Sequence, residues 1–127
     1  RLHEIDVARP LEIAGERIVP VSGHHSERFE VTGYRIGRMA YLTDFKTIAD
    51  AEVGKLIGVE LLVVNALRFR PHPSHFNIEE ALALIARVAP RRALITHVSH
   101  EIGRHAATTA LLPRGVELAY DGLEIII

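Results

Sequence analysis

Cysteine is absent from this chain of 127 residues, and so is any long apolar run. Without cysteine the chain can form neither disulfide bonds nor a thiolate metal site, so a transition-metal site must use imidazole and carboxylate ligands. No apolar stretch approaches the roughly 18 residues that would suggest a membrane span. Residues 1–7 mix charged and apolar side chains, unlike a signal peptide. We therefore expect a cytoplasmic protein with no membrane partner.

A charge excess of either sign is also missing. Lys and Arg together number 15 and Asp and Glu 16, which gives a net charge of −1. Because proteins that bind polyanions usually carry a basic excess, nucleic acid is not an expected partner. The hydrophobic fraction of 48% is too high for a disordered chain and is sufficient for a packed core.

The apolar pattern predicts an α/β fold in which helices cover a sheet. Short β-branched or alternating runs predict strands, and the nearly unbroken apolar run at 59–66 predicts a strand covered on both faces. Gly33 marks a bulge or a close approach of two backbones. A turn at Asp121-Gly122 joins the last two predicted strands into a hairpin. The predicted strands cover residues 17–22, 29–36, 39–43, 59–66, 93–96, 116–120 and 123–127.

Helices are predicted between the later strands. Asp50 can cap a short helix at 51–57, and Gly58 can end it. Asn77 and Glu80 have the spacing of a capping box, and apolar residues at helical spacing follow them as far as Pro90. A further short helix is expected at 103–111. Residues 68–76 hold two prolines and two histidines and should form a loop.

Histidine is unusually frequent in this chain. Seven of the eight histidines fall in three clusters, and each cluster comes after a predicted strand. Loops at strand ends are where α/β folds usually build their sites. The clustered histidines are His24, His25, His72, His75, His97, His100 and His105.

Each candidate residue also has an ordinary explanation when it is taken alone. His24 and His25 could form a solvated turn, and because neighbours on a strand point to opposite faces, at most one should enter a given site. Asp44 could cap a helix or bind a metal, since a carboxylate can bridge two cations. His97 and the histidines of loop 68–76 could lie on the surface. Together, convergent imidazoles and one carboxylate suit a zinc or manganese site that activates water.

Six segments of the chain, in this order, resemble the C-terminal half of the metallo-β-lactamase superfamily. Within it, they resemble the cyclic ribosyl phosphate phosphodiesterases of phosphonate degradation. Each segment alone is unspecific, but the ordered set, which spans about residues 18–127, is specific. The segments are Val19-Pro20 to His25-Ser26, Gly33-Tyr34-Arg35, Tyr41-Leu42-Thr43-Asp44, Ser74-His75-Phe76, Thr96-His97-Val98-Ser99-His100 and Tyr120-Asp121-Gly122-Leu123.

The resemblance implies roles for individual residues. His25 matches the histidine ligand of one metal ion, with His24 as the alternative. Asp44 matches the aspartate that bridges two metal ions, and His97 matches the histidine ligand of the second. His75 matches the histidine that the family is proposed to use as catalytic proton donor. Further motif residues are candidates for orienting the ligands by hydrogen bonds: His72, His100 and Asp121.

The sequence also departs from the family. The HxHxDH motif, which supplies most ligands of both metals, is absent here, and the resemblance places it before everything in this chain. We therefore expect residues 1–127, with their abrupt start on Arg1, to be the C-terminal part of a single metallo-hydrolase domain. That domain would be a four-layer αββα sandwich, of which this chain supplies half.

The same departure predicts how this half should behave alone. It should bind metal poorly and be inactive, because a catalytic zinc site normally has three protein ligands. It should also associate with itself or with the missing N-terminal half, which would cover apolar sheet such as part of residues 59–66.

By resemblance, the whole protein is a hydrolase with two divalent metal ions, zinc or manganese, acting on a small phosphodiester, cyclic ones included. His75 would protonate the leaving alkoxide, a role that suits an imidazole. Two alternatives stay open at this point. One is a hydrolase of the same fold that cleaves an ester, a lactone or another non-phosphate bond. The other is a non-catalytic module that has lost its metals.

Overall fold

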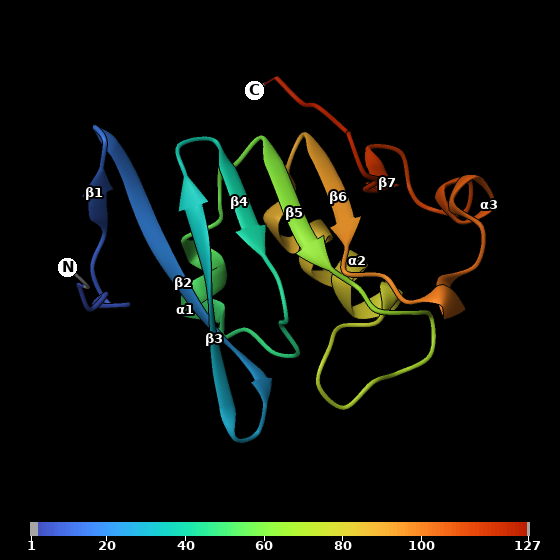
Figure 1. Cartoon of the computed structure of the whole chain (residues 1–127), viewed down its shortest axis with the longest axis horizontal. Helices are drawn as coiled ribbons and strands as arrows, with labels where there is room; N and C mark the ends of the chain where they lie inside the picture. Colours follow the sequence, from blue (N-terminus) through green and yellow to red (C-terminus); the bar gives the residue numbers. More distant parts are fainter. Residues whose placement is uncertain (1–2, 127) are drawn as a thin grey trace.

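The fold is a single mixed sheet whose strand order in space follows the sequence (Figure 1). The structure is a computed structural model and describes residues 3–126. Strands β1 to β4 pair antiparallel, whereas β4 to β7 pair parallel. The strands are β1 (Leu11–Ile13), β2 (Glu16–Ser26), β3 (Phe29–Ile36), β4 (Met39–Leu42), β5 (Leu61–Asn65), β6 (Arg92–Thr96) and β7 (Val116–Leu118). The predicted α/β class is confirmed.

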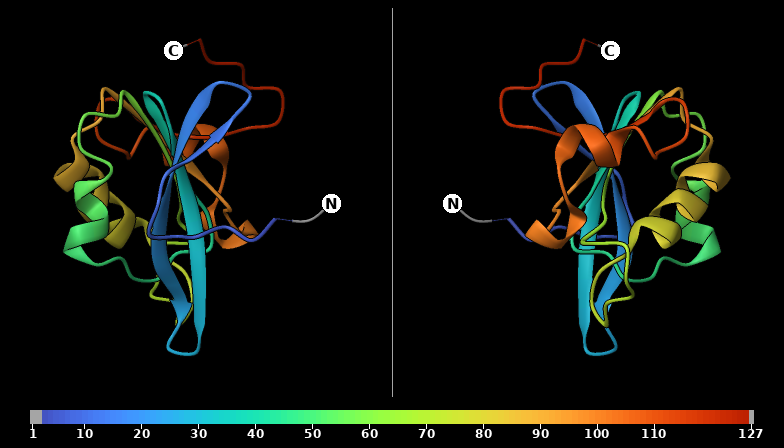
Figure 2. Two further views of the ribbon diagram at one scale, coloured as in Figure 1. Left: turned by 90° about the vertical axis from the view of Figure 1, so that its left-hand side faces the viewer. Right: turned by 90° about the vertical axis from the view of Figure 1, so that its right-hand side faces the viewer.

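Helical segments connect the parallel strands. Helix α1 (Asp50–Gly54) joins β4 to β5, and α2 (Ile78–Val88) joins β5 to β6. A 3₁₀ turn, η1 (His100–Ile102), and the short helix α3 (His105–Thr109) precede β7. Figure 2 shows α1 and α2 together on one side of the sheet. Their apolar residues form the main core with side chains of β4, β5 and β6, so this face of the sheet is closed.

Part of the opposite face of the sheet, over β5 and β6, is covered by the chain after β7. Leu61, Val63 and Leu94 are buried there against a tail that includes Leu123 and Ile125. All five residues of β5 are therefore buried. The expectation that residues 59–66 need a missing half for cover is wrong for β5, because the tail of this same chain covers it.

The start of α2 follows the prediction from the sequence. The Asn77 side chain accepts a hydrogen bond from the Glu80 N–H, and the Glu80 carboxylate accepts one from the Asn77 N–H, both at 2.8 Å. The second oxygen of Glu80 lies 2.6 Å from the Lys46 ammonium. The capping box therefore also ties α2 to the segment that follows β4.

The predicted cap of α1 is wrong. Ala49 is the N-cap residue, without a side-chain bond, and Asp50 is the first residue of the helix, which ends at Gly54. A carboxylate is equally favourable in a first helical turn, because it faces the positive end of the helix dipole. The Asp50 carboxylate also pairs with Arg87 of α2.

The predicted terminal hairpin is also wrong. The turn at Asp121-Gly122 forms, with Leu123 N–H donating to the Tyr120 carbonyl at 3.1 Å, but residues 119–126 contain no strand. Residue 127 lies outside the described residues. The physical reason is burial, since Leu123 and Ile125 pack on the second face of the sheet instead of pairing with β7.

Strand β2 is longer than predicted and continues through the histidine pair to Ser26. Its pairing with β3 contains a bulge, because His24 lies opposite Glu30 and Ser26 opposite Phe29. At Gly33, where a bulge or a close approach was expected, the approach is found: an added Cβ would lie 2.4 Å from Leu42 Cδ2. In the described part of the chain, none of the helices has the length and apolarity to cross a membrane.

Candidate metal centre

The candidate residues meet at one edge of the sheet. Strand β2 runs in the same direction as the parallel strands, because two antiparallel pairings separate it from β4. The carboxyl ends of β2, β4, β5 and β6 therefore share an edge, the lower one in Figure 1. His25 lies near the end of β2, Asp44 follows β4 and His97 follows β6, while the loop after β5 carries His72 and His75.

The side chains of four candidates converge on this edge. His75 Nε2 lies 3.2 Å from Asp44 Oδ1, and His97 Nε2 lies 3.4 Å from the same oxygen. The ring of His75 stacks on that of His97 with 4.8 Å between centroids, and it meets the ring of His25 edge-on at 4.6 Å. The structure thus brings His25, Asp44 and His97 together as the sequence predicted, with His75 between them.

A bulge aims His25 at this cluster. His25 is the extra residue between the paired positions His24 and Ser26, and bulges commonly redirect a side chain beside a functional site. His25 Nδ1 lies 2.9 Å from the carbonyl oxygen of Asp44. If Nδ1–H donates that bond, Nε2 keeps its lone pair free for a ligand, which is the usual arrangement of a metal-bound histidine. His24 is exposed, so only one member of the pair enters the site.

Asp44 and His97 both have left-handed backbones, with φ values of 63° and 57°. This region is unusual for residues other than glycine, although Asp and His tolerate it better than most. Such conformations persist only where the surroundings impose them, and they are common at functional sites. At both positions the chain turns sharply as it leaves a parallel strand, which directs the side chain over the sheet edge.

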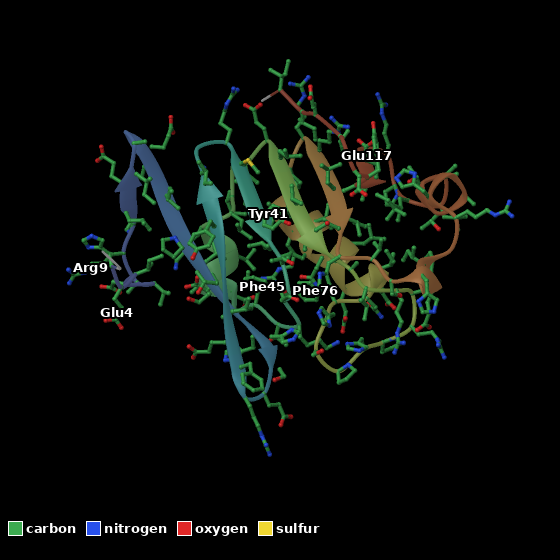
Figure 3. All side chains as sticks on the ribbon, viewed as in Figure 1. Glu4, Arg9, Tyr41, Phe45, Phe76 and Glu117 are labelled. Atoms are coloured by element: carbon green, nitrogen blue, oxygen red, sulfur yellow. The ribbon has the colours of Figure 1, made fainter. Side chains whose placement is uncertain are left out.

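Asn65, a buried residue that the sequence did not single out, holds the backbone next to Asp44. Its side chain accepts a hydrogen bond from Phe45 N–H at 2.8 Å and donates one to the Phe45 carbonyl at 2.9 Å. The same carbonyl accepts from Phe76 N–H at 2.8 Å, and both phenylalanines are labelled at this edge in Figure 3. The available signal was a single polar residue in an otherwise apolar strand, since a buried amide must find partners.

Of the three residues expected to orient the ligands, His72 lies beside the cluster, and His100 and Asp121 do not. The ring of His72 lies 5.1 Å from that of His75, and His72 Nδ1 accepts a bond from Ser74 N–H at 3.3 Å. His100 and Asp121 are exposed, and neither has a hydrogen bond to the cluster among the described residues. Their proposed orienting role finds no contact that would support it.

Mutual interactions shift the protonation of the cluster. Burial raises the pKa of the Asp44 carboxyl, but the hydrogen bond with His75 and the charge of His97 outweigh it, so the pKa lies below its usual value. Burial lowers the pKa of His75, and the neighbouring His25 and His97 lower it further against the opposing effect of Asp44. Burial and the charge of Arg68 also lower the pKa of His72. The shift at Asp44 favours an ionised carboxylate, which is the form that binds metals.

The chain belongs to the Beta-lactamase superfamily domain family, whose sequence profile matches residues 1–98. A diphosphatase from the PhnP family has a similar structure, with a TM-score of 0.94 and 35% sequence identity over all of this chain and 49% of that one. The fold also matches the metallo-β-lactamase fold protein YhfI from Bacillus subtilis, with 17% identity, a TM-score of 0.72, and 94% of this chain and 53% of that one covered. Human tRNase Z, short form, matches at 17% identity and a TM-score of 0.65, over 89% of this chain and 44% of that one.

A curated relative has a name from a different chemistry. The chain is 38% identical over 128 residues to a protein named octanoyltransferase from Porphyromonas gingivalis (strain ATCC BAA-308 / W83). That match takes in 100% of this chain but 26% of the relative. The chain thus spans about a quarter of that protein and about half of the matched structures.

The donor set fits the divalent metals that this fold family implies. Ligand atoms of His25, Asp44 and His75 lie within 4.8 Å of one another, and His97 Nε2 approaches the same carboxylate. Imidazole and carboxylate ligands suit zinc and other first-row metals. The geometry alone allows His75 as a ligand as well as a proton donor, so its role must be separated from that of His97 by experiment.

Proposed function

We propose that the protein carrying this chain is a metal-dependent hydrolase of a small phosphodiester, cyclic ones included. The observation that carries the proposal is the convergence of three imidazoles on one carboxylate at the sheet edge, where His75 and His97 approach the same oxygen of Asp44. Its similarity to a PhnP-family diphosphatase supports phosphorus chemistry. Two divalent ions, zinc or manganese, are the proposed cofactors.

In this proposal three residues hold the metals. His25 offers Nε2 to one ion because its Nδ1 is engaged by the Asp44 carbonyl. The Asp44 carboxylate would be a ligand of both ions, and His97 would hold the second. Bound divalent ions would activate a water molecule and neutralise charge on the phosphoryl oxygens. Further ligands would come from a missing N-terminal half, the proposed partner of this chain, and self-association and a cytoplasmic location remain part of the proposal.

His75 is the proposed proton donor to the leaving alkoxide. Its ring is held between His25 and His97 and is mostly buried, so it has a fixed position beside the proposed metal ligands. Ser74 Oγ lies 3.1 Å from its Nδ1, which fixes one ring nitrogen and leaves Nε2 directed at the cluster. A positioned acid of this kind typically contributes roughly 10²–10⁴-fold to the rate.

The test compares His75→Ala with His97→Ala in the whole protein. Loss of His75 should leave the metal content near that of the wild type and lower turnover of an alkyl phosphodiester by roughly 10²–10⁴-fold. The loss should be small for a nitrophenyl phosphodiester, whose leaving group needs no proton. Loss of His97 should lower metal content and turnover of both substrates together.

Three outcomes would contradict the proposal. Equal loss on both substrates, with metal lost from the His75 variant, would make His75 a ligand and not an acid. Turnover of an acyl ester or a lactone by the wild type, without turnover of any phosphodiester, would reject the substrate class. A wild-type protein that binds neither zinc nor manganese would reject the metal centre itself.

A further inference from the structure

A fully buried asparagine stands at the end of an apolar strand, and the sheet does not require it. Asn65 has no exposed surface, and the four residues before it in β5 are apolar. Burying an amide without hydrogen-bond partners is unfavourable, so a buried asparagine needs partners for both ends of its side chain. One residue, Phe45, satisfies both ends of this side chain. Its N–H donates to the Asn65 side-chain oxygen, and its carbonyl accepts from the Asn65 side-chain nitrogen.

The position of this contact defines the path of the chain through Asp44. The last paired residues of β4 and β5 are Leu42 and Val64. The next residue of β5 is Asn65, and it holds the backbone of Phe45. The stretch between the two attachments is therefore Thr43-Asp44, and a loop this short between neighbouring anchor points must turn sharply. The left-handed φ of Asp44, 63°, is that turn.

The ring of Phe45 extends the same constraint to β2. A Cβ at Gly23 would lie 2.2 Å from Phe45 Cε1, so the ring packs directly on the β2 backbone two residues before His25. The Phe45 carbonyl also accepts from Phe76 N–H, next to His75 in the chain. Phe45 thus contacts the segments that carry His25 and His75, and it directly follows Asp44.

We propose that Asn65 is a positioning residue, whose carboxamide fixes the backbone of Phe45 and thereby the placement of Asp44 and its contact with His25. It touches neither substrate nor metal and acts through these residues. The inference rests on the proposed function in that it takes His25 and Asp44 as metal ligands.

The experiment uses the whole protein with Asn65→Leu, which has a similar volume and removes both hydrogen bonds. Its control is Val64→Ala, a fully buried change in the same strand without a bond to residues 43–45. Zinc affinity, measured by competition titration, should fall roughly 10–100-fold in Asn65→Leu, as is typical when a partner of a metal ligand is lost. It should be unchanged in Val64→Ala, even if both variants melt at a lower temperature.

A second readout needs no metal. The His25 Nδ1–H that donates to the Asp44 carbonyl should give a protected imidazole proton signal in the metal-free protein, assigned by its loss in His25→Ala. That signal should disappear in Asn65→Leu and persist in Val64→Ala. If Asn65→Leu does not fold, Asn65→Asp replaces it, because an ionised Asp still accepts from Phe45 N–H but cannot donate to the carbonyl. The zinc affinity of Asn65→Asp should be lower than that of the wild type, but by less than the loss expected for Asn65→Leu.

Wild-type zinc affinity and a retained His25 signal in Asn65→Leu, or in Asn65→Asp where the first variant fails to fold, would overturn the proposal. Equal loss of affinity in Val64→Ala would also overturn it, since the effect would then be general destabilisation. If the wild type binds no zinc, the proposed function fails, and the His25 signal alone decides the role of Asn65.

Discussion

Two residues of the candidate site are held in a left-handed backbone conformation that is unusual for residues other than glycine. In the described part of the chain, the non-glycine residues with positive φ are Ala14, Asp44, Ala89 and His97. Ala89 is the C-cap of α2 and Ala14 lies in the turn between β1 and β2, where such geometry is common. The other two are proposed metal ligands, so the strain at these strand ends belongs to the site rather than to the general fold.

This strain predicts an unusual order of stability at position 97. Both His97→Ala and His97→Gly remove the imidazole, but alanine must keep a left-handed backbone at φ 57°. The glycine variant should therefore be more stable to unfolding than the alanine variant, by about 1 kcal/mol. Chemical denaturation of the two variants measures the difference.

Ala83 provides the control for this comparison. It is exposed in the middle of α2, a right-handed helix, so Ala83→Gly should destabilise by about 1 kcal/mol. If the His97→Gly variant is less stable to unfolding than the His97→Ala variant, as Ala83→Gly is expected to be relative to the wild type, the left-handed conformation of His97 would be rejected.

The residues that sequence could predict at this scale are those with an obvious chemistry. Asp44 and the clustered histidines stood out because their side chains bind metals and follow apolar strands. Asn65 did not, because its importance comes from a contact with Phe45, 20 residues away in the chain. A contact of this kind becomes visible only when the strands are placed side by side.

At the scale of elements, glycine allows β2 and β3 to approach their neighbours. An added Cβ at Gly23 would lie 2.2 Å from the Phe45 ring and 2.8 Å from the Thr47 carbonyl oxygen. At Gly33 it would lie 2.8 Å from the Tyr41 carbonyl oxygen. Backbone atoms cannot move aside as a flexible side chain can, so these positions require glycine for packing rather than for a turn.

Gly23→Ala should therefore destabilise the protein, by about 1–3 kcal/mol, because overpacking forces the backbone or the Phe45 ring to shift. Gly54, the last residue of α1, is the matched control: an added Cβ there meets nothing within 4 Å. Gly54→Ala should raise stability by about 0.5–1 kcal/mol, because alanine favours helix and restricts the unfolded chain. Thermal unfolding of both variants would contradict the packing argument if Gly23→Ala melted like the wild type.

Elements were predictable where their signals are local. The capping box at Asn77 needs only residues within one helical turn, and α2 begins where it predicts. The terminal hairpin had an equally good local signal at Asp121-Gly122, and the turn does form. Its second strand does not, because Leu123 and Ile125 pack against apolar residues of β5 and β6 instead of pairing with β7. That outcome depends on the whole sheet and not on the turn.

At the scale of the whole molecule, this chain covers the centre of its own sheet on both faces but supplies few ligands for the proposed metal ions. Within residues 3–126, helices close one face of the sheet and the tail after β7 covers the centre of the other. Tyr41, on that second face, is 43% exposed and lies outside this cover. The donors at the sheet edge amount to three converging imidazoles and one carboxylate, which are to be shared between two proposed metal ions.

The isolated chain should therefore fold but bind zinc weakly. Its β5 is buried on both faces by its own residues, whereas under the proposed function each ion would receive only one histidine and a share of Asp44 from this chain. A catalytic zinc normally has three protein ligands. Because even an outer partner of a ligand is worth about 10–100-fold in affinity, zinc should bind residues 1–127 at least ~100-fold more weakly than the whole protein.

Calorimetric titration of both proteins measures this difference in zinc affinity, and Asp44→Asn in the isolated chain should abolish the residual binding. A tight isotherm with two ions per chain, insensitive to Asp44→Asn, would show that the site is built differently from the one described.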